Sequence, residues 1–172
     1  IENNIHSPGP VFKYVNKNLN SKLKNSNLIK VKGTEADDVI AITVRYIRAV
    51  NPNKKIIIIT GDYDFLQLYE PNCVELYQLK GWKQMISDNP RLSMMIKILS
   101  GDPSDNIPPI YKGCGKKTAI KLANDPESLN KALEKYGKER YELNCKLVDF
   151  NFIPEKLVKK IEEHLDNINF QK

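Results

Sequence analysis

Cysteine, histidine, tryptophan and long apolar runs are all scarce in this chain of 172 residues. Its three cysteines, Cys73, Cys114 and Cys145, are odd in number and far apart, so neither a disulfide framework nor a zinc knuckle is indicated. No apolar run approaches the ~20 residues that a membrane span needs, and the first residues have no signal-peptide pattern. We therefore expect a soluble, intracellular protein without a membrane association, with one core and a small appended subdomain.

Acidic residues are outnumbered in this chain, whose net charge is +6, yet many of them gather in three short clusters. The seven clustered carboxylates are Glu35, Asp37, Asp38, Asp62, Asp64, Asp102 and Asp105. Dense like charge requires a counter-ion, and carboxylate oxygens are preferred ligands of hard divalent cations such as Mg²⁺ and Mn²⁺. The clusters therefore predict a divalent-metal site that would meet an anionic substrate.

Each acidic cluster, taken alone, also has a purely structural explanation. Acids at 35–38 suit the first turn of a helix, and those at 62–64 suit a turn after a strand. The acids at 102–105 suit a turn between two helices. The co-occurrence of three clusters favours the metal site, because elements that end at the same edge of a sheet can bring their acids together.

Basic residues are concentrated in two places. Residues 11–32 contain six lysines and no acid, which suits a phosphate backbone but is equally typical of a solvated helix face. The second group surrounds a turn that contains Gly113 and Gly115, followed by Lys116, Lys117 and Thr118. Glycines let a backbone approach a phosphate, and the amides of a following helix point toward it, although an ordinary tight turn would have the same pattern.

Hydrophobic spacing predicts an α/β order followed by helices. The expected elements are a helix over 11–23, a strand over 28–31, a helix from an N-cap at Thr34 to Asn51, strands over 56–59 and 74–79, and helices from about residue 91. Residues 56–59 are uniformly apolar and β-branched, which is typical of a strand covered on both faces. This order predicts a doubly wound parallel sheet, whose ligands bind beyond the carboxyl ends of the strands.

Four motifs, in this order, resemble those of the structure-specific 5′ nucleases, which include flap endonucleases and the 5′-3′ exonuclease domain of bacterial DNA polymerase I. They are Glu-Ala-Asp-Asp at 35–38, Thr-Gly-Asp-Tyr-Asp-Phe-Leu-Gln-Leu at 60–68, Gly-Asp-x-Ser-Asp-Asn-Ile at 101–107 and Gly-x-Gly-Lys-Lys-Thr-Ala at 113–119. Residues 67–74 and 147–154 are most similar to the phage ribonuclease H branch of that family. The resemblance extends from about Leu28 to the last residue.

The resemblance implies a PIN-like core over residues 1–90, with the end of a helical arch, and a helical helix-hairpin-helix region over 91–172. It implies two Mg²⁺ or Mn²⁺ ions about 4 Å apart, which activate water and stabilise the leaving oxygen of a phosphodiester. Glu35, Asp37 and Asp38 would serve the first ion, and Asp62, Asp64, Asp102 and Asp105 the second. The catalytic acids would be Glu35, Asp37, Asp62 and Asp64. Residues 113–119 would grip the duplex backbone, with a K⁺ ion held at the hairpin.

The implied activity is a divalent-metal-dependent 5′ nuclease in replication or repair. Its substrates would be 5′ flaps, nicks or ends of DNA, with RNA in RNA-DNA hybrids as a further substrate, and it would act as a monomer alongside replication proteins. The alternative is a non-catalytic DNA-binding module of the same fold, which would gain nothing from seven clustered acids beside DNA. Because the family's first aspartate-ended strand and basic arch do not precede Ile1, we expect this chain to be the latter part of a longer polypeptide.

Overall fold

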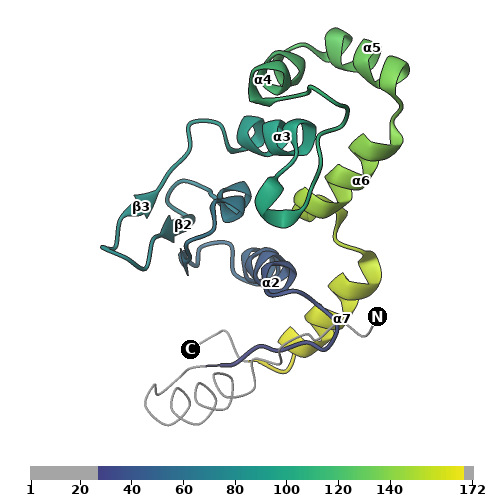
Figure 1. Ribbon diagram of the computed structural model, residues 1–172. Helices are drawn as coiled ribbons and strands as arrows, with labels where there is room; N and C mark the ends of the chain where they lie inside the picture. The colour runs from purple at the N-terminus through teal and green to yellow at the C-terminus, as the bar shows by residue number, and fades with distance from the viewer. Residues whose placement is uncertain (1–26, 169–172) are drawn as a thin grey trace.

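The computed structural model describes residues 27–168 (Figure 1). The helix expected over 11–23 and the lysines of that stretch up to Lys24 lie outside these residues. The described elements, in chain order, are α2 (Ala36–Val50), β1 (Ile56–Ile59), the 3-10 helix η1 (Tyr63–Leu68), β2 (Val74–Tyr77), β3 (Gln84–Met85), α3 (Pro90–Ser100), the 3-10 helix η2 (Pro103–Asp105), α4 (Lys116–Asn124), α5 (Pro126–Tyr136), α6 (Glu139–Val148), the 3-10 helix η3 (Phe150–Phe152) and α7 (Glu155–Leu165).

The described sheet is small and mixed, with the strand order β1-β2-β3. Strands β1 and β2 are parallel, with Ile56 opposite Val74, whereas β2 and β3 form an antiparallel hairpin. The inward side chains of β1 and β2 pack on α2, η1 and η3 in one core that includes Ala41, Ile58 and Leu76. The α/β class is thereby confirmed, and the strands expected at 56–59 and 74–79 are present with close to the expected bounds.

Three details of the sequence prediction are wrong. Residues 28–31 form no strand, because Val31 packs between α2 and α7 instead of joining the described sheet. Thr34 is not the N-cap of α2: its hydroxyl donates to the Val31 carbonyl (2.8 Å), and Glu35 occupies the cap. Strand β1 is not covered on both faces by the described residues, since Ile57 is 55% exposed and Ile59 is 48% exposed.

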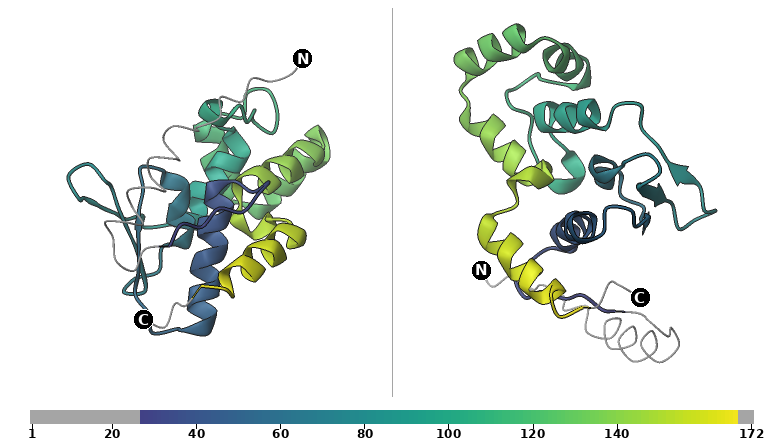
Figure 2. Two further views of the ribbon diagram at one scale, coloured as in Figure 1. Left: turned by 90° about the horizontal axis from the view of Figure 1, so that it is seen from below. Right: turned by 180° about the vertical axis from the view of Figure 1, so that it is seen from behind.

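The helices α3 to α6 form a second packed region, which lies at the top of Figure 1. Helix α3 packs on α4 and on α6, and Leu99, Cys114, Ala119 and Leu133 share one apolar cluster. Helix α7 then returns beside α2, as both views of Figure 2 show, and buries Ile161 and Leu165 against it. No helix within residues 27–168 is both long and apolar enough to cross a membrane.

Candidate active site

Two aspartates are placed by the end of strand β1. The chain leaves the strand at Ile59, and Asp62 then caps η1 by accepting a hydrogen bond from the backbone N–H of Asp64 (2.8 Å). A short acidic side chain suits this position, because it satisfies an amide that the first helical turn leaves unpaired. The cap therefore orients Asp62 and Asp64 at the carboxyl end of β1.

Two further aspartates follow helix α3. Gly101 ends α3 with a φ of 73°, and Asp102 then caps η2 by accepting from the backbone N–H of Ser104 (2.8 Å) and from its hydroxyl. The backbone of Asp102 also pairs with Ile107 in both directions, at 2.8 and 2.9 Å. This closed turn holds Asp102 and Asp105 beside the last turn of α3.

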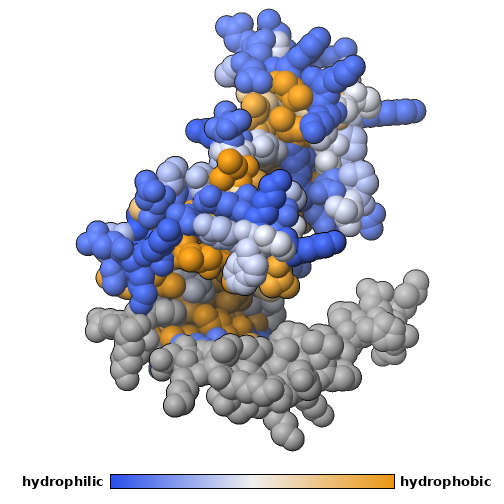
Figure 3. All heavy atoms as spheres, turned by 90° about the vertical axis from the view of Figure 1, so that its left-hand side faces the viewer, coloured by the Kyte–Doolittle hydropathy of each residue, from blue (hydrophilic) through white to orange (hydrophobic). Residues whose placement is uncertain are grey.

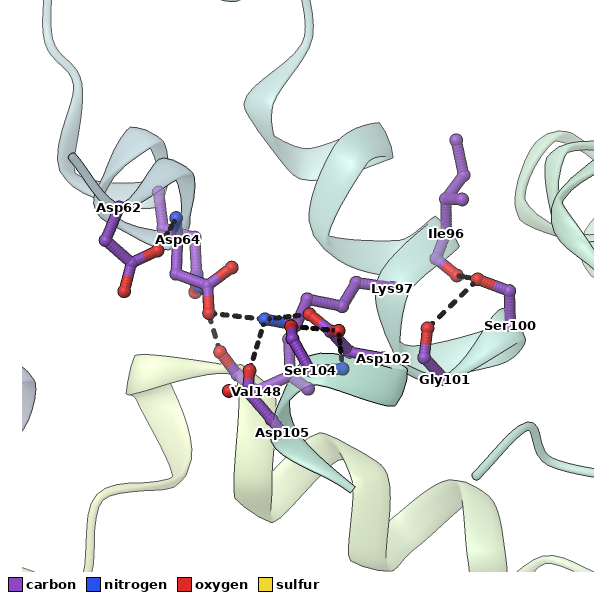
Figure 4. A network of polar contacts seen from close by, with 11 residues as sticks. Asp62, Asp64, Ile96, Lys97, Ser100, Gly101, Asp102, Ser104, Asp105 and Val148 are labelled. Atoms are coloured by element: carbon purple, nitrogen blue, oxygen red, sulfur yellow. Dashed lines mark hydrogen bonds and ion pairs between the residues drawn. The ribbon is translucent and has the colours of Figure 1, made fainter. Parts of the chain in front are cut away.

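Lys97, on the last turn of α3, lies at the centre of these aspartates (Figure 4). Its Nζ lies 2.6 Å from an oxygen of Asp64, 2.8 Å from one of Asp102 and 2.9 Å from one of Asp105. Sequence reasoning missed this residue, and the only signal available was a lysine one turn before the Gly-Asp motif. One ammonium thus compensates three carboxylates that come from two separate parts of the chain.

The charges of this group act on one another. Burial lowers the pKa of Lys97, but the hydrogen bonds to Asp102, Asp64 and Asp105 outweigh burial and raise that pKa above its ordinary value. The Lys97 ammonium and the Ser104 hydroxyl lower the pKa of Asp102 to about 2. Burial raises the pKa of Asp64, and Lys97 offsets this only in part. The site therefore holds more negative charge than its single lysine neutralises.

The first acidic cluster lies at the start of α2. Asp37 raises the pKa of Glu35, with burial, Asp38 and Asp105 adding to the effect, and burial followed by Asp37 raises the pKa of Asp38. Glu35, Asp37 and Asp38 line a small depression against α6 and η3. Asp105 belongs to the other group, and its contribution to the raised pKa of Glu35 indicates a weak electrostatic interaction between the two acidic groups.

The acidic clusters line two depressions, and the expectation that they form one metal site stays a prediction. Asp62, Asp64, Asp102 and Asp105 line one of them together with Lys97. Glu35, Asp37 and Asp38 line the other. The physical reason is that Glu35 caps α2 and Asp37 and Asp38 lie on its first turn, whereas Lys97 holds Asp64, Asp102 and Asp105 beside α3.

The donor set fits a hard divalent cation. Three carboxylates already converge on one positive centre, the Lys97 ammonium, and every ligand in the group is an oxygen, as Mg²⁺ and Mn²⁺ prefer. Within residues 27–168, however, no group of three acidic, histidine or cysteine side chains is placed to bind a metal ion directly. A cation would therefore bind through water, or after Lys97 withdraws.

The glycine turn at 113–115 leads directly into α4. Gly113 has a φ of 95°, Gly115 caps the helix, and the buried Cys114 anchors the turn in the helical core. Lys116 and Lys117 are exposed on the first turn of α4, and Thr118 is half-buried. Lysines at a helix N-terminus are disfavoured by the helix dipole, so helix stability does not explain them. An anion bound at this end of α4 would explain these lysines.

Two family models match the chain. The model of the 5′-3′ exonuclease N-terminal resolvase-like domain matches residues 10–97, and the model of the C-terminal part of T4 RNase H matches residues 88–171. The chain belongs to the 5′-3′ exonuclease family, and the resemblance noted in the sequence is thereby confirmed. The acidic clusters at 35–38, 62–64 and 102–105 and the glycine turn at 113–115 all lie within the residues that these two models match.

Among individual relatives, the chain is 31% identical over 150 residues to ribonuclease H of Enterobacteria phage T4, with 77% of this chain and 48% of that protein covered. It is 35% identical over 136 residues to DNA polymerase I of Caldicellulosiruptor bescii, with 72% of this chain and 16% of that protein covered. The chain therefore spans about half the length of the phage relative and a smaller share of the polymerase.

Solved structures from phage T5 share the fold. A mutant of the T5 5′-exonuclease superposes with a TM-score of 0.68 at 17% identity, over 91% of this chain and 75% of that chain. The T5 D15 protein co-crystallised with metal ions gives a TM-score of 0.69 at 16% identity, over 94% of this chain and 71% of that chain. The PIN-like fold class is thus confirmed.

Proposed function

We propose that this chain carries the latter part of a divalent-metal-dependent 5′ nuclease, which hydrolyses phosphodiester bonds at 5′ flaps, nicks or ends of DNA. The observation that carries the proposal is the convergence of Asp64, Asp102 and Asp105 on one positive centre. Membership of the 5′-3′ exonuclease family supports it. RNA in RNA-DNA hybrids is proposed as a further substrate, because the T4 relative is named ribonuclease H.

The acids have distinct roles in this proposal. Asp62, Asp64, Asp102 and Asp105 would hold one Mg²⁺ or Mn²⁺ ion, and Glu35, Asp37 and Asp38 a second. Bound there, the ions would supply Lewis-acid activation of water and charge stabilisation of the leaving oxygen. The chain's own carboxylates orient these positions through the caps at Asp62 and Asp102, and no side chain is needed as a nucleophile.

The glycine turn and α4 are proposed to hold the duplex. Gly113, Gly115, Lys116, Lys117 and Thr118 would bind backbone phosphates, with K⁺ bound at the turn. The charge of the exposed lysines and the free amides of the first helical turn both suit an anionic backbone. We propose the division into a nuclease core at 1–90 and a DNA-binding region at 91–172 on the same grounds, with a monomer as the active form and replication proteins as partners.

Cleavage of a 5′-labelled flap substrate with and without Mg²⁺ tests the proposal. Asp62→Asn should abolish metal-dependent cleavage by the complete protein while leaving DNA affinity without metal unchanged or higher, because the substitution removes a negative charge near the substrate. Glu134→Gln, an exposed acid on α5, is the matched control and should cleave normally. Wild-type cleavage by Asp62→Asn would show the metal assignment to be wrong.

A second arm separates binding from chemistry. Changing Lys116 and Lys117 together to Ala should weaken duplex binding equally for all sequences and flatten its salt dependence by up to about two units of slope. Changing two other exposed lysines, Lys131 on α5 and Lys156 on α7, removes the same charge elsewhere. An unchanged salt slope in the first variant would show that the glycine turn is only structural.

A further inference from the structure

The tip of the β2–β3 hairpin is an exposed apolar feature that the proposed chemistry does not use. Residues 79–82 form the tip of the loop that connects the strands, and this loop projects away from the helices, as Figures 1 and 2 show. Leu79 is 71% exposed and Trp82 is 62% exposed. A large apolar side chain stabilises a fold only where it is removed from water, so core packing does not account for either residue.

The backbone at Trp82 is unusual as well. Gly81 and Trp82 both have positive φ angles, of 79° and 52°, and the hairpin is closed by the backbone N–H of Gln78, which donates to the Lys83 carbonyl (2.8 Å). Glycine and asparagine adopt this conformation readily, whereas a bulky side chain does so at a cost. Turn formation therefore disfavours tryptophan at position 82, and its presence points to a contact beyond the part of the chain that the structure describes.

The charge around the tip identifies the chemistry of that contact. Lys80 and Lys83 are both exposed, and no acidic residue lies between Glu75 and Asp88. Neither lysine forms an ion pair within the part of the chain that the structure describes. Figure 3 shows the side of the molecule that carries the hairpin. Hydrophilic side chains dominate this side, and hydrophobic atoms are exposed between them. Aromatic groups can stack on bases and cationic groups can bind phosphates, so a surface on which the two alternate suits a nucleic acid.

The tip is also tied to the acidic site. Gln78, at the base of the tip, donates through Nε2 to the hydroxyl of Tyr63 (3.0 Å), and Tyr63 stands in the chain between Asp62 and Asp64. Tyr63 is itself 61% exposed. A nucleic-acid strand whose phosphate lies at the aspartates would therefore have aromatic surface within reach on the hairpin side of the site.

We propose that the hairpin tip binds the single-stranded part of the substrate, with Trp82 stacked on an unpaired base and Lys80 and Lys83 against neighbouring phosphates. A single strand is specified because base faces are open to stacking only when the bases are unpaired. The proposal rests on the proposed nuclease function, since it concerns the strand that reaches the same aspartates. A protein partner would use the apolar residues but would leave the two lysines without a role.

Trp82 is the only tryptophan in the sequence, so tryptophan emission, excited at a wavelength that the eight tyrosines do not absorb, reports on this position alone. A short oligothymidylate, added in metal-chelating buffer to prevent cleavage, should quench this fluorescence to saturation, and a blunt duplex should quench it much less. Trp82→Asn removes the ring and suits the left-handed turn, so the hairpin should remain folded. This variant should bind a labelled oligothymidylate between about 5-fold and 150-fold more weakly by anisotropy.

Two further variants complete the test. Trp82→Tyr keeps an aromatic face and should recover most of the lost affinity, whereas a purely structural role of the indole would not predict recovery. Changing Lys80 and Lys83 together to Ala should reduce the salt slope for the single strand by about 1.4. Val50→Ala, at the end of α2, removes an apolar side chain of similar exposure and should leave binding unchanged.

Unchanged emission with oligothymidylate, or equal affinity of Trp82→Asn and the wild type, would overturn the inference. Emission that shifts with rising protein concentration but not with DNA would overturn it in favour of a contact between chains. The nuclease proposal fails separately, through wild-type cleavage by Asp62→Asn. Loss of the tip contact alone would leave metal-dependent cleavage at nicks in place.

Discussion

At the scale of single residues, Lys97 is the counter-ion of the aspartate group. Its side chain is 18% exposed, so its three ion pairs are shielded from water more than surface pairs are. In this geometry Lys97 would compete with a divalent ion, because both cations would use the oxygens of Asp64, Asp102 and Asp105. Lys97 thus stabilises the metal-free protein and, in the proposed nuclease, would oppose metal binding.

Lys97→Met is therefore expected to have opposite effects in the absence and presence of metal. Without metal, the free energy of unfolding should fall by about 2 kcal/mol, because the carboxylates lose their partner. Mn²⁺ affinity, measured by isothermal titration calorimetry, should rise by on the order of 10-fold, because a competing charge is gone. Lys97→Arg keeps the charge and serves as the control. Weaker Mn²⁺ binding by Lys97→Met would contradict this role.

Asp102 should make metal-free stability depend on acid pH. Its pKa of about 2 in the folded chain lies below the ~3.9 of an unfolded aspartate. A lowered pKa contributes stability above the unfolded value, and that contribution is lost as the pH falls from about 4 toward 2. The stability difference between the wild type and Asp102→Asn, from urea unfolding at several pH values, should shrink over this range. A constant difference would show that Lys97 does not hold Asp102 ionised.

At the scale of elements, the junction between α3 and η2 depends on Gly101. Its φ of 73° turns the chain sharply, and an added Cβ would overlap the Ile107 carbonyl oxygen and the backbone of Pro108 and Pro109. Asp102 follows this turn directly, and its backbone forms two hydrogen bonds with the backbone of Ile107. The close approach of backbone to backbone leaves room only for glycine.

Gly101→Ala should consequently lower the free energy of unfolding by more than about 3 kcal/mol, since backbone strain and overlap add together. Gly137→Ala is a matched control, because Gly137 also has a positive φ (90°) but has open space around it. That variant should lose only about 1–2 kcal/mol. Urea unfolding of both variants measures the difference, and equal losses would show that the overlap at Gly101 relaxes easily.

At the scale of the whole molecule, Asn144 joins three parts of the helical region. It is fully buried on α6, and its Nδ2 donates to the carbonyls of Ile98 on α3 and Pro108 in the loop after η2, both at 2.9 Å. Gln67 makes a similar link from η1, donating to the Val148 carbonyl (2.9 Å) and accepting from the Phe150 amide (3.3 Å). These side chains connect the sheet region, the acidic site and the helices.

Asn144→Ala should lower the free energy of unfolding by about 2–4 kcal/mol, because two buried carbonyls lose their donor. Asn124→Ala is the control, since the Asn124 side chain is exposed and donates to one carbonyl of its own helix; it should change stability by less than about 1 kcal/mol. Chemical denaturation provides both values. Equal stability of the two variants would show that the Asn144 contacts are replaced by water.

The sequence by itself was enough for the α/β class, the strands at 56–59 and 74–79, the three acidic clusters and the glycine turn before α4. These features depend on local pattern: apolar runs, capping acids and glycines keep their meaning wherever the chain places them. Local pattern gave the wrong prediction where packing against elements distant in the sequence determined the backbone conformation. Residues 28–31 have the composition of a strand, but Val31 packs on α2 and α7 and the stretch joins no described sheet.

The arrangement of the acids was decided only by tertiary structure. Spacing along the chain placed Asp62, Asp64, Asp102 and Asp105 at the ends of elements, but it carried no information that the last turn of α3 would set the Lys97 ammonium among them. Nor did it separate the acids at 35–38 into their own depression. The reason is physical: an ion pair between residues 33 positions apart depends on how η1 and α3 pack, and packing is a property of the folded chain.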